Sequence, residues 1–473
     1  MADLEQQEHL LLEQERKRFP DLFRTEPIVD SPEMLRWIGI ENVFEEYPLG
    51  HIKYMPQDFV VEEIAGDKTL STIDIGDPIQ SLEGEGRTFY GQAVKVGMTT
   101  FKMREELARM LGIPMEKVAT AGLKDEVAIT SQQVSLREVQ NQEKLAQLQS
   151  EHFFVKNLTR GKGVFKRGDL WGNRFSLVVR TQETISEKEK VRIQNELKNI
   201  SEQGFWNFFS FQRFAAPRLN GHLIGKHLLR EEYQEALENL LFFQSPREEP
   251  YFQRIREEAR QHWGSWEHIM RAMAPFPSRF PTELQVLGSL VRNPKDIIGA
   301  FRAIPDQVRL WIYAYASLLF NKKISQAVSQ GEVLAKLPFI TSRYPQDWEH
   351  YKTFLQEDGV HLPSPIYRTF PFLQTPSFVV PPTVPTLQSV EIHAVHFLEK
   401  MMAISFSLPK GAYATTFLAH LFQVSSEAPL PPGIDTTLID TKAVLGLGSL
   451  SPVLERFRIV LDRIGEKRAL DGR

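Results

Sequence analysis

The sequence predicts an α+β fold in which a strand-rich domain is interrupted by a largely helical insertion. Three observations support this prediction. Strand-like runs alternate with amphipathic helices over 51–215, helical periodicity dominates over 217–328, and strand character returns at 401–408. A chain of 473 residues is long enough for two or three domains. We therefore expect the strand-rich domain to be discontinuous in the chain.

The strand-rich part begins with 51–64 and 88–96, where apolar and β-branched residues predict strands. A helix is predicted over 101–112, because Met103, Leu107 and Leu111 form an apolar stripe that ends at Gly112. A turn with Lys124 and Asp125 leads into an apolar, β-branched run from Val127 to Leu136. Extended character returns over 153–180, centred on a strand over 170–180 that starts with a bend at Gly172 and Asn173. Ser186 and Glu189 form a capping box, which predicts a helix through about residue 203.

The remaining patterns set the expected domain limits. An amphipathic helix is predicted over 4–19, and helices of the insertion are predicted over 219–230, 231–243, 251–272, 282–291 and 304–328. A strand at 401–408 and the helix after it complete the first domain, and a final helix is predicted over 451–466. We predict a helical extension over 1–45, the discontinuous domain over 46–216 and 396–424, the insertion over 217–395, and a linker with a helix over 425–473.

Composition excludes several classes of protein. The chain has no cysteine, which excludes disulfides, thiolate metal sites and cysteine nucleophiles. The first eight residues are acidic and polar, unlike a secretory signal. The longest mostly apolar run, 310–320, is too short to span a bilayer. We therefore expect a soluble, cytoplasmic protein that does not bind a membrane.

Several catalytic motifs are also absent. The chain has no phosphate-binding loop of the Gly-x-x-x-x-Gly-Lys-Ser/Thr type, no dinucleotide fingerprint and no Gly-x-Ser-x-Gly elbow. His393 and His396 are three residues apart but lack an obvious third ligand. We interpret these histidines as structural and expect no metal site.

The charges are unevenly distributed. The net charge of −4 argues mildly against nucleic-acid binding over the whole surface. One stretch, however, contains a single acidic residue, Asp169, among seven basic ones: Lys156, Arg160, Lys162, Lys166, Arg167, Arg174 and Arg180. Such a stripe could hold a polyanion, although a solvated strand face explains it equally well.

Four short segments carry residues suited to chemistry on a nucleic-acid base. They are Asp58-Phe59, Lys124-Asp125, Gly172-Asn173-Arg174-Phe175 and the stretch from Lys410 to Tyr413. Each has a simple structural explanation: a core phenylalanine, a solvated loop corner, a bend into a strand and a half-buried aromatic. Together they supply a carboxylate on a turn, an amide for hydrogen bonds to a base and rings for stacking. That combination predicts an enzyme that acts on a flipped-out base.

These segments resemble the TruD family of tRNA pseudouridine synthases. The resemblance covers about 50–420 and rests on segments in the same order as in the family. They are 56–63, Lys95 with Thr99 and Thr100, 121–125 with Thr130 and Gln132, 172–175 with Arg180, 207–214, 314–317 with Phe320 and Asn321, and 408–415. The resemblance implies a pseudouridine-synthase domain with a mixed or antiparallel sheet, an inserted α/β TRUD domain and a V-shaped cleft for RNA.

The resemblance also implies an activity and a set of site residues. A uridine, usually uridine 13 in the D arm of tRNA, would be isomerised to pseudouridine without a cofactor. Asp125 would be the catalytic residue, attacking ribose C1′ or base C6 or otherwise promoting glycosidic cleavage, and Lys124 would tune or position it. Asn173, Phe175, Phe59 and Tyr413 would contact the substrate.

We expect the basic residues Lys162, Lys166, Arg167 and Arg174 to contact the RNA backbone, and the protein to be a monomer. Two alternatives stay open. The chain could be a non-catalytic RNA-binding or RNA-folding protein, or it could modify another RNA by the same chemistry. An intact Asp125 and Asn173 favour the enzyme.

The chain departs from the family pattern at a few residues. Glu126 stands where a basic residue is usual, and Ala316 replaces a usual glutamine. Ser210 and Ala215 replace two glycines, which is acceptable only if their backbone φ angles are negative. Glu126 adds negative charge beside Asp125 and the RNA, which could weaken RNA binding or raise the pKa of Asp125.

Overall fold

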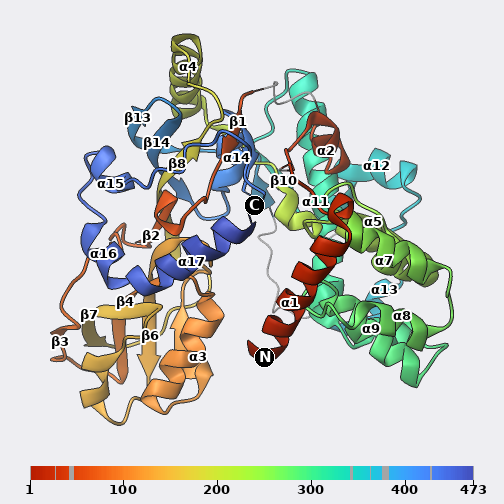
Figure 1. The fold of residues 1–473 in the computed structure, drawn as a ribbon, viewed down its shortest axis with the longest axis horizontal. Coiled ribbons are helices and arrows are strands. Elements are labelled where there is room, and N and C mark those ends of the chain that lie inside the picture. The colour runs from red at the N-terminus through yellow and green to blue at the C-terminus, as the bar shows by residue number, and fades with distance from the viewer. Residues whose placement is uncertain are drawn as a thin grey trace. The chain divides into compact units, whose positions relative to one another are not determined.

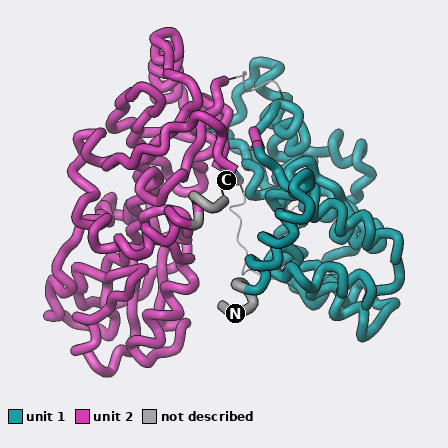
Figure 2. The backbone as a smooth tube through the Cα atoms, viewed as in Figure 1, with its two compact units in different colours: residues 1–25, 30–45, 206–387 teal, residues 26–29, 46–205, 388–473 magenta. Residues whose placement is uncertain are grey.

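The computed structural model describes residues 2–26, 28–41, 47–340, 345–362, 364–374, 383–426 and 429–471. The chain forms two compact units (Figure 2). Unit 1 comprises Met1–Thr25, Asp30–Glu45 and Trp206–Leu387, and unit 2 comprises Glu26–Val29, Glu46–Phe205 and Gln388–Arg473. This division groups the N-terminal helix with the 206–387 segment and groups residues 429–471 with the strand-rich segments.

Both units contain helices (Figure 1). The helices of unit 1 are α1 (Ala2–Arg18), α2 (Pro32–Trp37), α5 (Gly221–Leu229), α6 (Tyr233–Phe242), α7 (Pro250–Arg260), α8 (Trp266–Met273), α9 (Pro281–Arg292), α10 (Ile297–Arg302), α11 (Pro305–Ser329), α12 (Lys352–Glu357) and α13 (Ile366–Thr369). Those of unit 2 are α3 (Thr100–Leu111), α4 (Glu187–Gln203), α14 (Ala414–Ala419), α15 (Thr441–Val444), α16 (Ser451–Arg456) and α17 (Arg458–Asp471).

Unit 2 is built on a mixed sheet of eleven strands, counted over the described residues. Its strands are β1 (Leu49–His51), β2 (Phe59–Ala65), β3 (Ile79–Ser81), β4 (Thr88–Val96), β5 (Val118–Thr120), β6 (Ile129–Arg137), β7 (Phe153–Gly161), β8 (Leu170–Arg180), β13 (Glu391–Phe397), β14 (Met401–Pro409) and β15 (Gln423–Ser425). The main path runs β13-β14-β8-β2-β6-β4-β7-β3, with β5 beside β6 and β1 beside β8 and β15. Along this path β2 is parallel to β6 and β3 to β7. The predicted α+β class is confirmed.

The two faces of the sheet carry different side chains, because strand residues alternate between faces. On β8, Asn173, Phe175 and Leu177 share one face, and Arg174 and Ser176 point to the other. The first face packs against α3, α4 and α14, where the core includes Phe59, Ile193 and Phe417 in one cluster and Leu107 in another. The second face packs against α16 and α17, which lie across β2 and β4 in Figure 1. The sheet therefore forms the middle of three layers.

The predicted ends of the helices in unit 2 follow from local chemistry. The Thr99 hydroxyl accepts the Lys102 amide at the start of α3, and Gly112 ends this helix at φ 69°. Ser186 and Glu189 form the predicted capping box of α4. The helix predicted over 451–466 is instead two helices, α16 and α17, which are separated at Phe457.

Unit 1 is mainly helical, with short strands β10 (Lys336–Pro338) and β11 (Thr383–Pro385) paired antiparallel. The short strands β9 (Phe205–Trp206) and β12 (Leu387–Gln388), each of which has one residue in unit 1 and one in unit 2, also pair. The helix predicted over 251–272 is divided into α7 and α8, because Gly264 takes a left-handed φ of 88° between them. The N-terminal helix α1 packs on its own unit, where Tyr251 donates a hydrogen bond to Glu15 at 2.8 Å.

The two family glycine positions behave differently in unit 1. Ser210 has a φ of −86°, which is the negative value that a side chain requires. Ala215 instead has a φ of 64°, in the left-handed region that favours glycine. An alanine in the left-handed region costs roughly 1–2 kcal/mol relative to glycine. Ala316, expected to replace a glutamine, is buried in α11.

Ala215→Gly should therefore stabilise the protein by about 0.5–1 kcal/mol, because the relief of the left-handed backbone exceeds the entropy that glycine adds to the unfolded chain. Chemical unfolding followed by circular dichroism measures this difference. Ser210→Gly is the matched control and should destabilise the protein, since the φ of Ser210 is already favourable for a side chain. Equal effects of both substitutions would contradict the argument.

Candidate active site

Asp125 lies on the loop between the antiparallel strands β5 and β6, as the sequence predicts for a carboxylate on a turn. Its side chain is 43% exposed, so the carboxylate is within reach of a ligand. Oδ2 of Asp125 is 3.2 Å from Nζ of Lys53, and the same ammonium lies 4.4 Å from the ring centroid of Phe59. Lys53 therefore places a positive charge directly beside the carboxylate of Asp125.

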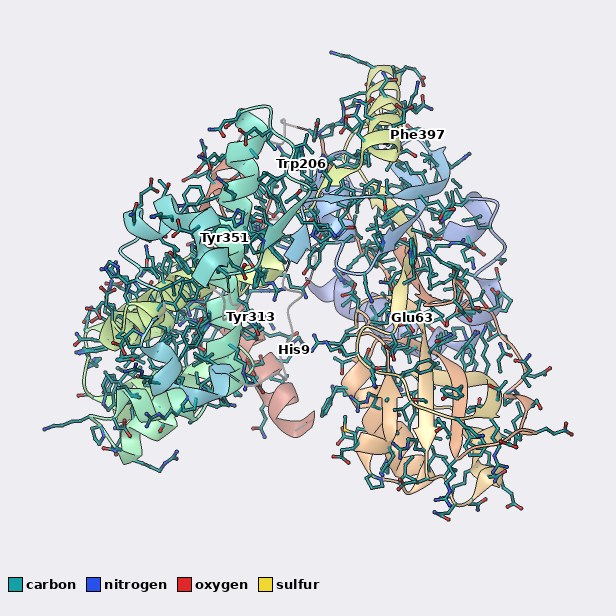
Figure 3. The ribbon with its side chains drawn as sticks, turned by 180° about the vertical axis from the view of Figure 1, so that it is seen from behind. His9, Glu63, Trp206, Tyr313, Tyr351 and Phe397 are labelled. Carbon is teal, nitrogen blue, oxygen red and sulfur yellow. The ribbon has the colours of Figure 1, made fainter. Side chains whose placement is uncertain are left out.

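Lys124 does not contact the side chain of Asp125. Its ammonium bonds to the carboxylate of Glu63, and both of these side chains are buried. Glu63, labelled in Figure 3 among the strands of unit 2, also accepts the backbone N–H of Gln133 at 3.0 Å. The Lys124 amide donates to the Thr100 hydroxyl at 3.0 Å. Lys124 therefore anchors the loop, and the cation beside the Asp125 carboxylate is Lys53.

A second lysine, Lys95, fixes the backbone of the loop that carries Asp125. Lys95 on β4 is fully buried and donates to the carbonyl oxygens of Asp125, at 2.6 Å, and Met98, at 2.7 Å. Burial lowers the pKa of Lys95 to about 8, and the negative charges of Asp125 and Glu126 oppose this shift. Lys95 thus fixes the backbone of Asp125 while its own charge is costly to bury.

Asn173 lies opposite Glu63 in the ladder between β8 and β2 and opposite Leu408 in the ladder between β8 and β14. Opposed residues share a face, with their Cβ atoms about 5 Å apart. Asn173 therefore lies beside the Glu63–Lys124 pair that anchors the Asp125 loop. Its Oδ1 atom is buried and has no hydrogen-bond partner among the described residues. A buried amide oxygen of this kind is an acceptor available to a donor on a ligand.

Phe59 and Phe175 lie in the core on the same face of the sheet. Their rings meet edge to face at a centroid distance of 6.0 Å, and Phe175 stacks on Phe406 at 5.3 Å. Phe59 is only 2% exposed. The Phe59 ring lies beneath the Lys53 ammonium, and Phe175 packs behind it. The direct contact of either ring with a substrate stays a prediction.

Gly172 and Asn173 do not form the predicted bend, because both lie within the ladder of β8. A Cβ atom on Gly172 would lie 2.0 Å from the carbonyl oxygen of Leu408. Glycine is thus needed here because the backbone of β14 approaches closely. β14 ends at Pro409, and the loop after it leads to Tyr413, which precedes α14. Tyr413 is half-buried near the Asn173 end of β8.

Three loops are joined at this end of the sheet. The Gly168 amide donates to the Ala121 carbonyl at 2.8 Å, which links the basic loop 162–169 to the Asp125 loop. The Lys410 ammonium donates to the Gly168 carbonyl at 2.8 Å, and the Lys410 amide donates to the Trp171 carbonyl at 2.8 Å. The carboxylate, the basic loop and the loop to Tyr413 are therefore connected by hydrogen bonds within unit 2.

The predicted RNA-backbone residues fall into two groups. Lys162, Lys166 and Arg167 are exposed on the loop 162–169, and Lys162 pairs with Glu85 at 2.5 Å where both side chains are largely in solvent. Arg174, by contrast, lies on the face of the sheet opposite to Asn173, because it is the adjacent strand residue. Any contact of Arg174 with RNA would have to be made from that other face.

A family model described as tRNA pseudouridine synthase D (TruD) matches residues 45–338, which is more than half of the chain. The chain belongs to the TruD family. The probable tRNA pseudouridine synthase D of Methanopyrus kandleri is 30% identical over 346 residues, covering 69% of this chain and 83% of that relative. The tRNA pseudouridine synthase D of Aquifex aeolicus is 29% identical over 293 residues, covering 61% of this chain and 69% of that relative.

The fold is shared with a solved TruD structure. The crystal structure of the putative tRNA pseudouridine synthase D (TruD) from Methanosarcina mazei matches with a TM-score of 0.63 and 22% sequence identity. The match covers 84% of this chain and 99% of that chain. At this identity the likeness supports the TruD fold of the present chain, and family membership places it among enzymes of the isomerase class.

Sequence reasoning on this TruD chain missed residues that meet only in space. Lys53 lies 72 positions before Asp125, and no spacing rule connects the two. Leu123 and Phe101 are 72% and 60% exposed beside the anchored Lys124 and Thr100. The only sequence signal for these two residues is that each is a large apolar residue among polar neighbours. That signal does not show that their side chains are exposed. Glu126 is also exposed on this loop.

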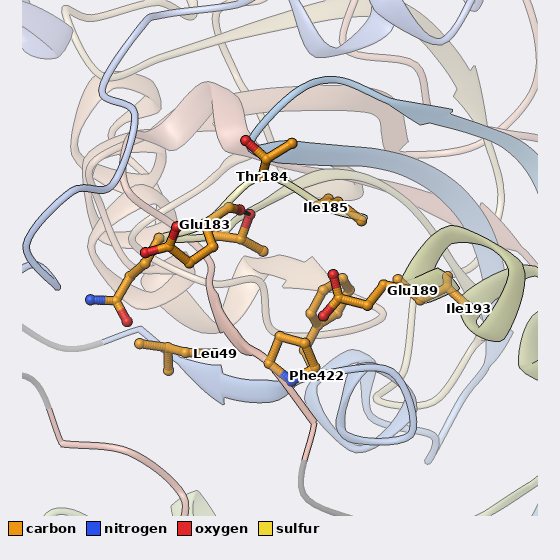
Figure 4. Close-up of a pocket in the computed structure, with 10 residues that line it drawn as sticks. Leu49, Glu183, Thr184, Ile185, Glu189, Ile193 and Phe422 are labelled. Atoms are coloured by element: carbon orange, nitrogen blue, oxygen red, sulfur yellow. Dashed lines mark hydrogen bonds between the residues drawn. The ribbon is translucent and has the colours of Figure 1, made fainter. Parts of the chain in front are cut away.

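A pocket of about 180 Å³ lies elsewhere in the TruD-type sheet unit (Figure 4). Leu49, Ile185, Ile193 and Phe422 are among its lining residues. The pocket lies where the chain leaves the Arg180 end of β8. At about 3.3 Å per residue, this end of the strand is roughly 25 Å from Asn173. The pocket therefore contains none of the candidate site residues.

Two features are absent from the described residues. None of the helices there is long and apolar enough to cross a membrane. No group of three or more His, Asp or Glu side chains in that part of the chain could hold a metal ion.

The buried Lys95 leads to a test by pH. Its pKa falls from 10.5 in the unfolded chain to about 8 in the fold. The unfolded chain therefore binds more protons between these two values, and stability rises with pH across this window. Relative to Lys95→Met, the wild type should gain up to about 3 kcal/mol in free energy of unfolding from about pH 8 to about pH 10.5.

Urea unfolding of both proteins at the two ends of this window measures that gain. Lys102→Met, which removes an exposed lysine from α3, is the control and should leave the pH dependence of the wild type unchanged. The same pH dependence in the wild type and in Lys95→Met would contradict the assignment.

Proposed function

We propose that this chain isomerises a uridine of tRNA to pseudouridine, with Asp125 as the catalytic residue. The target would be uridine 13 in the D arm, as the family resemblance implies. One observation carries the proposal: in a TruD-family chain, the half-exposed Asp125 carboxylate is paired with Lys53 on a loop fixed by Lys95 and Lys124. Because tRNA is the substrate, we place the enzyme in the cytoplasm.

The chemistry needs a carboxylate and no external reactant. Asp125 would attack ribose C1′ or base C6, or would otherwise promote cleavage of the bond between N1 and C1′. The uracil then rotates, C5 bonds to C1′, C5 loses its proton and N1 gains one, so that the atoms balance without a cofactor. Lys53 would orient the carboxylate of Asp125 before the attack. The unpaired Oδ1 of Asn173 would accept the N3–H of the uracil and so hold the base.

The uridine must leave the base stack before Asp125 can reach it. Exposed apolar side chains next to the site can fill the place of an extruded base, and Leu123 and Phe101 are suited to this role. Tyr413 would contact the extruded nucleotide. The cations of Lys162, Lys166 and Arg167 would neutralise phosphates nearby, since their loop is hydrogen-bonded to the loop of Asp125.

The test of this function is a reaction with unmodified tRNA transcripts, followed by mapping of pseudouridine as carbodiimide-dependent stops of reverse transcription. The wild-type protein should produce a new stop at residue 13. A transcript with cytidine at that place is the matched control and should give none. Absence of any new stop across a full set of tRNA transcripts would contradict a tRNA synthase, and a stop at another residue would change the target only.

A second candidate is a non-catalytic RNA-binding or RNA-folding protein on the same scaffold. Exposed Glu126 favours it, because a second negative charge beside Asp125 departs from the family pattern. An RNA-annealing assay separates the two functions. A folding protein would accelerate annealing equally well as wild type and as Asp125→Asn, and would form no pseudouridine. The same chemistry on another RNA would instead give stops in total cellular RNA but not in tRNA.

The basic loop predicts how RNA binding depends on salt. If Lys162 and Arg167 each contact one phosphate, then Lys162→Ala and Arg167→Ala should each reduce the slope of log K against log salt by about 1. Filter binding of tRNA over a range of salt concentrations measures the slope. Lys188→Ala, on the exposed surface of α4, is the control and should leave it unchanged. An unchanged slope in the two loop variants would exclude their phosphate contacts.

A further inference from the structure

Residues 429–471 lie outside the stretch 45–338 that the family model matches, yet they are part of unit 2. Their helices α16 and α17 cover the face of the sheet opposite to Asn173. Val453, Phe457 and Val460 pack there with Val60 and Val94. The ring of Phe457 also stacks on a phenylalanine of β7, Phe154, at a centroid distance of 5.7 Å. This C-terminal segment is thus a structural layer of the unit and not a loose tail.

Polar contacts attach the same segment to the start of β2. Lys442 forms a buried ion pair with Glu62, with its Nζ 3.0 Å from Oε1. The Thr441 hydroxyl donates to the carbonyl of Gln57 at 2.7 Å. Glu62 and Gln57 lie on either side of Phe59. The C-terminal segment therefore holds the stretch of chain that leads from Lys53 into the sheet.

One contact reaches Lys53 itself. Nη2 of Arg468, on α17, donates to the carbonyl oxygen of Lys53 at 3.1 Å. The same helix passes beside Met55, whose Cε would lie 3.6 Å from a Cβ atom on Gly465. Lys53 has a φ of 60°, a conformation that costs a non-glycine residue roughly 1–2 kcal/mol. Such a backbone persists only where neighbouring contacts impose it.

We propose that the C-terminal segment positions the catalytic carboxylate through Lys53, and that Arg468 is the positioning residue. This inference rests on the proposed function of Asp125. The hydrogen bond from Arg468 holds the Lys53 carbonyl, and the left-handed backbone then directs the ammonium over Phe59 to Asp125. If the backbone of Lys53 relaxed to a negative φ, its side chain would point in another direction and its ammonium would move away from Asp125. Asp125 would lose its counter-charge without any change in the RNA-binding loops.

The first test compares Arg468→Met, which keeps an unbranched apolar stem and removes the guanidinium donors, with the wild type. The single-turnover rate of pseudouridine formation should fall about tenfold, while the Kd for tRNA stays within about twofold. Arg468→Lys, which retains a donor, should recover part of the rate. The control is Arg463→Met on the same helix, where Arg463 is exposed and pairs with Glu151 at 3.0 Å. This control should behave as the wild type.

A double-mutant cycle identifies the route of the effect. Lys53→Met should lower the rate at least as much as Arg468→Met, and adding Arg468→Met to Lys53→Met should lower it no further. A full tenfold loss in the Lys53→Met background would show that Arg468 acts elsewhere and would overturn the inference. An unchanged rate in Arg468→Met alone would overturn it as well.

Hydrogen exchange provides a readout that does not depend on activity. Arg468→Met should increase amide exchange in the peptide that contains Lys53 to Met55, and Arg463→Met should not. Increased exchange together with an inactive wild-type protein would contradict the proposed function while supporting the positioning contact. Unchanged exchange with an active wild-type protein would contradict the positioning contact alone.

Discussion

Asp125→Asn should reduce pseudouridine formation by at least about a thousandfold, because an amide can neither attack a sugar or base carbon nor carry the charge that promotes cleavage. The loop itself should survive the change. It is held by backbone contacts that asparagine retains, from Lys95 to the carbonyl of residue 125 and from the Lys124 amide to Thr100. The Kd for tRNA and the unfolding midpoint should therefore stay close to those of the wild type.

Single-turnover kinetics with the mapped transcript, alongside filter binding and thermal unfolding, measure the three quantities. Glu126→Gln is the matched control, since it removes a neighbouring exposed carboxylate and should leave the rate within a few-fold of the wild type. Equal product from wild type and Asp125→Asn would remove Asp125 from the catalytic role. A large loss in Glu126→Gln with little loss in Asp125→Asn would assign the catalytic role to Glu126 instead.

The wild-type pair of Asp125 and Lys53 shows where sequence reasoning reaches its limit. The turn that carries Asp125 was predictable, because the β-branched run after it predicts a strand. The partner of Asp125 was expected to be its neighbour Lys124. Lys124 instead turns into the sheet to meet Glu63, and the cation at Asp125 comes from a segment far earlier in the chain. Adjacent residues often point to different sides of an extended chain, so adjacency did not predict pairing.

The C-terminal segment illustrates the same limit at a larger scale. Its final helical region was predictable from the apolar residues Val453, Phe457, Val460 and Leu461. The surface on which these residues pack was not, because an amphipathic pattern specifies a buried face but not its partner. The ion pair between Lys442 and Glu62 joins residues 380 positions apart, and the hydrogen bond from Arg468 to Lys53 joins residues 415 positions apart. Only the folded chain brings them together.

Gly172→Ala should be among the most damaging substitutions in unit 2. The added Cβ would lie 2.0 Å from the Leu408 carbonyl oxygen and 2.9 Å from Cα of Pro409, and both of these atoms belong to backbone that cannot rotate away. Either the β8–β14 ladder separates locally or the strand shifts. Overpacking against backbone costs at least about 1–3 kcal/mol. Because Asn173 and the loop to Tyr413 lie at this point of the ladder, we expect activity to fall with stability.

Urea unfolding and the pseudouridine assay on the same preparation measure both effects. Gly66→Ala, at the end of β2, is the matched control, because a Cβ there meets nothing within 4 Å and should change neither quantity appreciably. A Gly172→Ala protein with wild-type stability would show that β14 can yield, and the close approach would then not explain the glycine. Gly172 thus differs from residue 215. At residue 215 the methyl group of alanine strains the backbone of that residue, whereas at residue 172 an added methyl group would displace the strand beside Asn173.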